Sequence, residues 1–182
     1  MTGSSKPDLR SDCSNCCGLC CVAPDQLSTQ DFAADKPADT PCQHLDEHNR
    51  CRIHDTRAED GYGACQGFEC FGAGQWITQH LFSGADWRDS DQTAEQMFAA
   101  YRQWLPRFEA AAMIETALPM VSDTAQPALL ETLQQLTSEQ AKLPVNGQAL
   151  RNQVLSQIRA AMDASPRAAA TPVRLTDVNP IS

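Results

Sequence analysis

The stretch DCSNCCGLCC, residues 12–21, places five of the chain's nine cysteines within nine consecutive positions. Thiolates three residues apart can turn both sulfurs toward one ion in a tight loop, so the CxxC spacing is frequent in zinc and iron–sulfur sites. CSNC (Cys13 and Cys16) and CGLC (Cys17 and Cys20) both have this spacing. The spacing predicts that this stretch forms half of a metal-binding site.

The other cysteines, Cys42, Cys51, Cys65 and Cys70, supply the distant half, and all nine precede residue 71. Eight or nine thiols are too many for one tetrahedral ion, so we expect either two metals or a polynuclear cluster with bridging thiolates. Zinc is the leading metal, because closed all-thiolate sites suit it and its binding supplies folding energy. Iron, an iron–sulfur cluster and copper(I) are the alternatives.

Two readings without a metal are weaker. The odd number of cysteines fits poorly with a closed set of disulfides. A thioredoxin-like CxxC follows a strand and opens a helix, whereas GSSKPDLRSD before Cys13 has no strand pattern.

His54, three residues after Cys51, is a less certain metal ligand. Its default role is to form a hydrogen bond to a ligand.

The sequence favours a non-catalytic protein over an enzyme. It has no Ser, His and Asp set with usable spacing and no HExxH, P-loop or GxGxxG motif. Cys17 is the one candidate nucleophile, provided that it is unligated and activated by a neighbouring metal or cation. The two glycines of GAGQ, residues 72–75, are expected to let the chain turn tightly beside the cysteines.

Charge and hydropathy bound the partners and the compartment. The formal net charge of -9 argues against nucleic acid, because binding to its backbone needs a surplus of Lys and Arg. No apolar stretch approaches the roughly 18 residues that span a bilayer, and the start, MTGSSKPDLRSD, lacks the apolar run of a secretory signal. We therefore expect a cytoplasmic protein with no membrane partner, in which cysteines stay reduced.

From residue 90 onward the apolar residues recur at helical spacing. Ser90 or Asp91 is expected to cap a first helix, and Pro106 to kink it or to begin a second one. One face of this region is expected to carry Met97, Phe98, Tyr101, Leu105 and Phe108.

Two more helices are predicted after this region, over residues 127–141 and 147–164. The first is expected to bury Leu129, Leu133 and Leu136. The second, capped at Asn146, is expected to bury Leu150, Val154, Ile158 and Met162.

These patterns predict a mainly α protein, in which an irregular, metal-stabilised, Cys-rich N-terminal module packs on a C-terminal bundle of about four helices. The expected organisation is a flexible N-terminus (1–11), the cysteine module (12–75), the helical region (76–164) and a flexible tail (165–182). The helical region would be the platform for a second copy of the chain or a protein partner.

The cysteine segments CSNCCGLCC, PCQHL, RCRIHDTR and ACQGFEC resemble, in this order, the YkgJ-type cysteine-cluster family (CxxCxxCC), described as zinc- or iron-chelating domains. The resemblance covers residues 12–75, and flagellin lysine methylases carry a related cluster. It implies that the ligands are Cys13, Cys16, Cys20, Cys21, Cys42, Cys51, Cys65 and Cys70.

This chain departs from the family pattern at three places. Many members have a tyrosine where His54 stands and a proline after the arginine at Arg57, and Cys17 is an extra cysteine. The longer form of the motif is similar to a bacterial subgroup in which pentapeptide repeats follow. FSGADW, residues 82–87, hints at one such repeat, but no array follows it.

Overall fold

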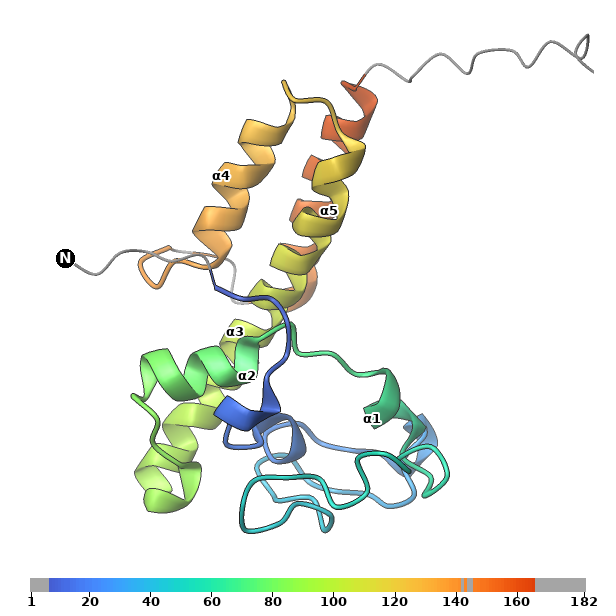
Figure 1. The fold of residues 1–182 in the computed structure, drawn as a ribbon, viewed down its shortest axis with the longest axis vertical. Coiled ribbons are helices and arrows are strands. Elements are labelled where there is room, and N and C mark those ends of the chain that lie inside the picture. Colours follow the sequence, from blue (N-terminus) through green and yellow to red (C-terminus); the bar gives the residue numbers. More distant parts are fainter. Residues whose placement is uncertain (1–6, 142, 144–145, 166–182) are drawn as a thin grey trace, which may run out of the picture.

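The fold is built around one long helix, α3 (Asp91–Ala117). The computed structural model describes residues 7–141, 143 and 146–165, and their secondary structure is mainly helical. The N-terminal segment lies against one side of the first half of α3, and two later helices lie along its second half (Figure 1). A mainly α fold with a Cys-rich N-terminal module and a C-terminal bundle is thus confirmed.

Helix α3 begins where the sequence predicts. The Ser90 side chain accepts a hydrogen bond from the Thr93 N–H (3.1 Å) and so caps the helix. The buried stripe differs from the prediction at one position, because Trp104 is buried and Leu105 is only partly so. Positions three and four residues after Tyr101 both lie on this face, and packing decides between them: the Trp104 ring lies 4.0 Å from that of Trp76, between centroids.

Pro106 lies inside α3, so the alternative in which it begins a second helix is wrong, while the alternative of a kink at Pro106 stays a prediction. Proline removes a single backbone N–H and therefore costs one hydrogen bond to the preceding turn. Its ring instead packs against the start of α5 (Gly147–Asp163). A Cβ at Gly147 would lie 2.9 Å from both Cβ and Cγ of Pro106, so a residue with a side chain fits poorly there.

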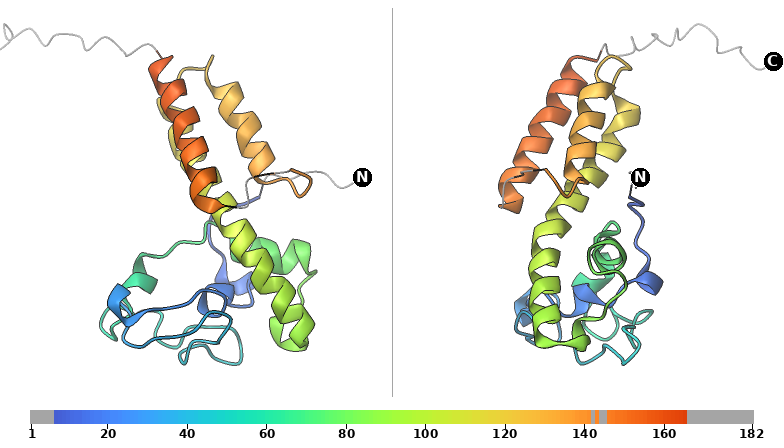
Figure 2. Two further views of the ribbon diagram at one scale, coloured as in Figure 1. Left: turned by 180° about the vertical axis from the view of Figure 1, so that it is seen from behind. Right: turned by 90° about the vertical axis from the view of Figure 1, so that its left-hand side faces the viewer.

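Helices α4 (Gln126–Leu136) and α5 pack on the second half of α3 as a three-helix bundle (Figure 2). Asn146 caps α5, and its Oδ1 accepts hydrogen bonds from the N–H groups of Gln148 (2.9 Å) and Ala149 (3.2 Å). The buried Arg107 guanidinium donates to the Leu136 carbonyl at the end of α4 (2.8 Å). The predicted apolar residues fill the core of this bundle, except Met162, which is exposed near the end of α5.

The N-terminal segment consists of loops and very short helices. Two isolated antiparallel bridges, Gln26 with Lys36 and Leu45 with Cys51, fix its loops. Its short elements are η1 (Cys13–Asn15), η2 (Leu19–Cys21), η3 (Ser28–Gln30), α1 (Gly63–Gly67), α2 (Ala73–Trp76), η4 (Ile77–Leu81) and η5 (Trp87–Asp89), and η6 (Leu118–Met120) follows α3.

This segment shares a hydrophobic core with the first half of α3. We call it the first core cluster; its buried residues are Cys17, Leu19, Val22, Ala23, Ala73, Trp76, Ile77, Met97, Phe98, Tyr101, Trp104 and Phe108. The segment is also tied to α3 by an ion pair between Arg102 and Asp39 (2.6 Å). No helix in the described part of the chain is both long and apolar enough to cross a membrane.

Candidate metal centre

Cys16 and Cys70 approach each other across the small residue Gly74 of α2. A Cβ at Gly74 would lie 2.7 Å from the Cys16 sulfur and 3.9 Å from the Cys70 sulfur, so both thiols border the same point. The chain reaches α2 through a tight turn with positive φ at Phe71 (50°) and Gly72 (86°). The turn expected at GAGQ is therefore present, and Gly74 has no side chain that would separate the two sulfurs.

Cys13 and Cys20 interact electrostatically with Cys70 as well. Burial raises the pKa of Cys13 and raises that of Cys16 to about 12, and the neighbouring Cys70 thiol adds to both shifts. The pKa of Cys20 is raised first by its hydrogen bond with Cys21, then by burial and by other thiols, Cys70 included. Cys70 thus acts on all three thiols, although Cys21 acts on Cys13 as well, and we call Cys13, Cys16, Cys20 and Cys70 the first thiol group.

The other four predicted ligands gather next to this group. Burial raises the pKa of Cys65 to about 11, and the thiols of Cys21, Cys42 and Cys51 add to the shift. Cys21 and Cys42 also raise the pKa of Cys51, after burial. The Cys21 carbonyl accepts a hydrogen bond from the Cys42 N–H (2.9 Å). These four, Cys21, Cys42, Cys51 and Cys65, form the second thiol group.

The two thiol groups adjoin at consecutive residues. The sulfurs of Cys20 and Cys21, both in η2, are 4.0 Å apart. The Cys20–Cys21 hydrogen bond lowers the pKa of Cys21, and the positive charges of Lys36 and Arg57 lower it further, while burial opposes these effects. The two groups therefore meet at this pair of neighbouring cysteines.

Two cations border the second thiol group. Lys36 is buried, and its ammonium donates to the carbonyls of Val22 (3.0 Å), Pro37 (3.1 Å) and Pro24. Arg57 donates to the Cys65 carbonyl (3.0 Å). Four thiolates on a divalent ion carry two surplus negative charges, which two cations offset.

Cys17 belongs to neither thiol group. It is 4% exposed, and its sulfur lies 3.4 Å from Thr78 Oγ1 and 3.9 Å from Met97 Sδ within the first core cluster. Burial raises its pKa, so the thiol stays protonated and unreactive at neutral pH. In this structure Cys17 is a core residue.

The histidines lie on the surface or against aromatic rings. His54 is exposed, with Nδ1 3.1 Å from an Asp55 carboxylate oxygen. His44 packs edge-on against Tyr62, with centroids 4.9 Å apart, and His80 stacks on Trp76 at 5.7 Å.

Two buried hydrogen-bond donors beside the thiols have no partner. Among the described residues, three buried side-chain atoms are in this state: Arg57 Nε, Tyr101 Oη and Gln157 Oε1. Arg57 donates to the Cys65 carbonyl, and Tyr101 belongs to the first core cluster, against which Cys20 packs. A buried donor without an acceptor lowers the stability of the folded state. A thiolate can accept the hydrogen bond that each of these donors lacks. From the sequence, Tyr101 could be placed only on the apolar face of the helix after residue 90, and this position indicates packing in the core.

The thiols are close to one another but do not converge on a point. No three His, Cys, Asp or Glu side chains in the described part of the chain, which includes every cysteine, are arranged so that they could hold one ion. Cysteine has a single side-chain torsion with three staggered positions, so its sulfur can be redirected without moving the backbone.

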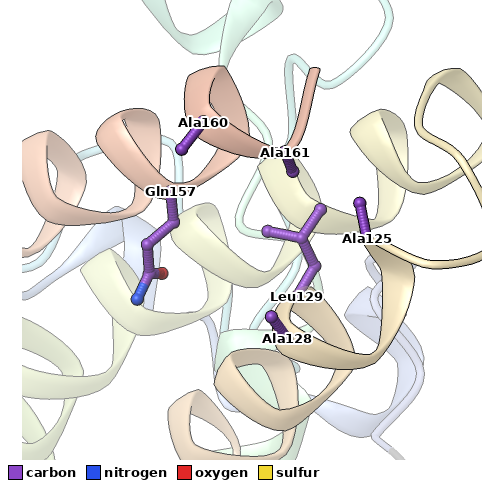
Figure 3. A pocket seen from close by; sticks show the side chains of 6 residues that line it. All are labelled: Ala125, Ala128, Leu129, Gln157, Ala160 and Ala161. Atoms are coloured by element: carbon purple, nitrogen blue, oxygen red, sulfur yellow. The ribbon is translucent and has the colours of Figure 1, made fainter. Parts of the chain in front are cut away.

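A pocket between α4 and α5 is a separate feature, with a volume of about 250 Å³ (Figure 3). Its lining is aliphatic except for one amide, and consists of Ala125, Ala128, Leu129, Gln157, Ala160 and Ala161. Such a lining can contact an apolar group, but it contains no side chain that could act as an acid, a base or a nucleophile. The chemically versatile side chains of this chain lie instead among the N-terminal loops.

The thiol pKa values predict that the metal-free chain loses stability in alkali. An unfolded cysteine ionises near pH 9.0, whereas folded Cys16 keeps its proton to about pH 12. The unfolded state therefore releases protons first, so stability is complete below about pH 9 and falls as the pH rises toward 12. Denaturant unfolding of the reduced, metal-free chain at pH 8 to 11 measures this slope. Cys16→Ser is expected to reduce the slope, and an unchanged slope would contradict the assignment.

Comparison with known proteins shows two partial relatives. Uncharacterized protein YybG of Bacillus subtilis (strain 168) is 47% identical over 94 residues, which are 52% of this chain and 34% of YybG. UPF0153 protein YeiW of Escherichia coli (strain K12) is 49% identical over 43 residues, which are 23% of this chain and 51% of YeiW. No family model and no solved structure matches the chain. The chain is thus similar to YybG and YeiW over part of each, and membership of the YkgJ-type family stays a prediction.

Proposed function

We propose that this protein binds metal through its two thiol groups, with one ion held by each. The observation that carries the proposal is the gathering of the eight cysteines, with the Cys16 and Cys70 sulfurs bordering one point at Gly74 and the others interacting electrostatically with their neighbours; two sets of four are our reading of this gathering. Four thiolates are the full ligand set of a structural zinc ion. Zinc is therefore the proposed metal, with iron as the second choice, and the role is structural or lies in metal handling.

The chemistry around the thiols supports this proposal. Lys36 and Arg57 supply positive charge beside the second group, and the unpaired Arg57 Nε and Tyr101 Oη supply donors for ligand sulfur. Metal-bound thiolates commonly accept hydrogen bonds of this kind, which tune the site. An iron–sulfur cluster is the alternative function, since it also takes four cysteines, and copper(I) is the further one.

The first experiment is anaerobic purification of the full chain, followed by metal analysis and a visible spectrum. The expected result is a colourless protein with one zinc ion for each thiol group. A brown protein with acid-labile sulfide would replace zinc with an iron–sulfur cluster. A chain that retains no metal and takes up none after reduction would contradict the proposal as a whole.

Gly74→Ala is expected to weaken metal binding at the first thiol group. The new methyl would lie 2.7 Å from the Cys16 sulfur, so Cys16 must turn away from Cys70. Loss of one well-placed ligand predicts a drop in affinity of at least about tenfold. Competition with a chromophoric chelator measures it. Gly67→Ala is the matched control, because a Cβ there meets nothing within 4 Å. Equal affinities of the two variants would show that Cys16 and Cys70 do not act together.

The cytoplasmic location and the use of the helical region by a second copy or a protein partner stay predictions. The bundle does expose large apolar side chains, Met120 (61%), Leu130 (46%) and Met162 (45%). Sedimentation of the metal-loaded chain tests whether it self-associates.

A further inference from the structure

Tyr101 is a buried tyrosine whose hydroxyl has no use in the core that surrounds it. The residue is 2% exposed and belongs to the first core cluster, against which Cys20 packs. Its Oη is buried and has no hydrogen-bond partner among the described residues. A buried tyrosine normally finds a partner for this atom, and phenylalanine would fill the same space without the penalty.

Cysteine thiols lie within electrostatic range of this hydroxyl, and the short helix η2, which carries Cys20 and Cys21, packs against α3. Burial raises the pKa of Tyr101, and the thiols of Cys20, Cys70, Cys16 and Cys21 raise it further. Three of these four cysteines belong to the first thiol group. Tyr101 therefore keeps its proton at neutral pH and is available as a donor on the side of α3 that faces η2.

We propose that Tyr101 is a positioning residue of the first metal site, whose hydroxyl donates a hydrogen bond to a ligand sulfur once that sulfur is a metal-bound thiolate. This inference rests on the proposed function and adds a residue that no cysteine pattern contains. A protonated thiol is a weak acceptor, whereas a thiolate accepts a charge-assisted bond. The hydrogen bond would fix the orientation of the sulfur and lower its electron density.

The two tyrosines of the chain provide a matched pair of variants. Tyr101→Phe removes only the unpaired hydroxyl. Tyr62→Phe removes a hydroxyl that already accepts a hydrogen bond from Gln43 Nε2 (2.9 Å), in a residue that is also buried and precedes Cys65 by three positions. Each full-length variant is reconstituted with Co²⁺, whose sulfur-to-metal charge-transfer bands report on the ligand sulfurs, and with Zn²⁺ for affinity.

Tyr101→Phe is expected to shift the charge-transfer band of one of the two bound ions. It is also expected to lower the affinity for that ion by about 10-fold to 100-fold. Its metal-free form should melt at the same temperature as the wild type or higher, because it loses an unpaired buried group. Tyr62→Phe should leave the spectrum unchanged.

The opposite results separate the two proposals. If Tyr101→Phe binds metal with the wild-type spectrum and affinity, the role of Tyr101 is wrong while metal binding stands. If Tyr101→Phe only lowers the melting temperature of the metal-free form, its role is structural. A wild-type chain that binds neither Co²⁺ nor Zn²⁺ would instead overturn the proposed function.

Discussion

Cys70→Ser is expected to remove the metal of the first thiol group and to leave that of the second in place. Cys70 acts electrostatically on Cys13, Cys16 and Cys20, and each of those thiols has its pKa raised by it. It is the one cysteine of the first thiol group that lies after residue 21 in the sequence. A serine hydroxyl is a poor ligand for a soft site, so the remaining three thiols would hold zinc weakly. Metal analysis should therefore find half of the wild-type content.

Two variants complete this experiment. Cys51→Ser should lose the other ion, because Cys51 belongs to the second thiol group. Cys17→Ser should keep both ions, since its sulfur contacts Thr78 and Met97 in the core. If Cys70→Ser lost both ions, and Cys51→Ser did the same, the eight thiols would hold one polynuclear centre. If Cys17→Ser lost as much as the others, the ligand assignment would be wrong.

Phe108→Ala is expected to be among the most destabilising substitutions in the helical region. The side chain is fully buried, and its ring lies 5.7 Å from that of Trp76 and 6.3 Å from that of Trp104, between centroids. Truncating a buried phenylalanine costs about 3–5 kcal/mol through lost transfer energy and the cavity that remains. For a chain of this size the melting temperature should fall by roughly 10 °C.

Phe108 lies where the two hydrophobic cores of the molecule meet along α3. It is the last member of the first core cluster along α3, and the core of the bundle begins two residues later at Ala110. Calorimetry of the metal-free form measures the loss. Phe68→Ala is the control, because that ring is 41% exposed and should cost at most about 1 kcal/mol. Equal losses in the two variants would contradict the central place of Phe108.

The helices were predictable because their apolar residues repeat. Leu129, Leu133 and Leu136, for example, are buried as the spacing predicted. The prediction failed where packing decides between neighbours, as with Leu105 and Trp104. The alternative of a second helix at Pro106 also failed, because a sequence pattern does not reveal that Gly147 packs on the ring and that the helix continues.

The eight cysteines of the candidate site could be named from the sequence, and their role as ligands stays a prediction. Cys20 and Cys21 are adjacent in the sequence, yet the distant thiol that acts on Cys20 is Cys70, whereas Cys21 acts on Cys51 and Cys65, because the loops after η2 bring these cysteines back to it. Loops of this kind have no periodicity from which their path follows. Tyr101 was missed for a related reason, because a tyrosine on an apolar stripe looks the same whether its hydroxyl is paired or not.

The aromatic residues of the first core cluster make the two halves of this molecule optically distinct. All three tryptophans of the chain are part of this cluster or pack against it: Trp76 and Trp104 are buried in it, and Trp87 packs against it through Phe98. Intrinsic fluorescence therefore follows the cysteine loops and the first half of α3, whereas far-ultraviolet circular dichroism is dominated by α3, α4 and α5. Recording both signals during one metal titration would show directly whether ion binding orders only its own surroundings or the whole chain.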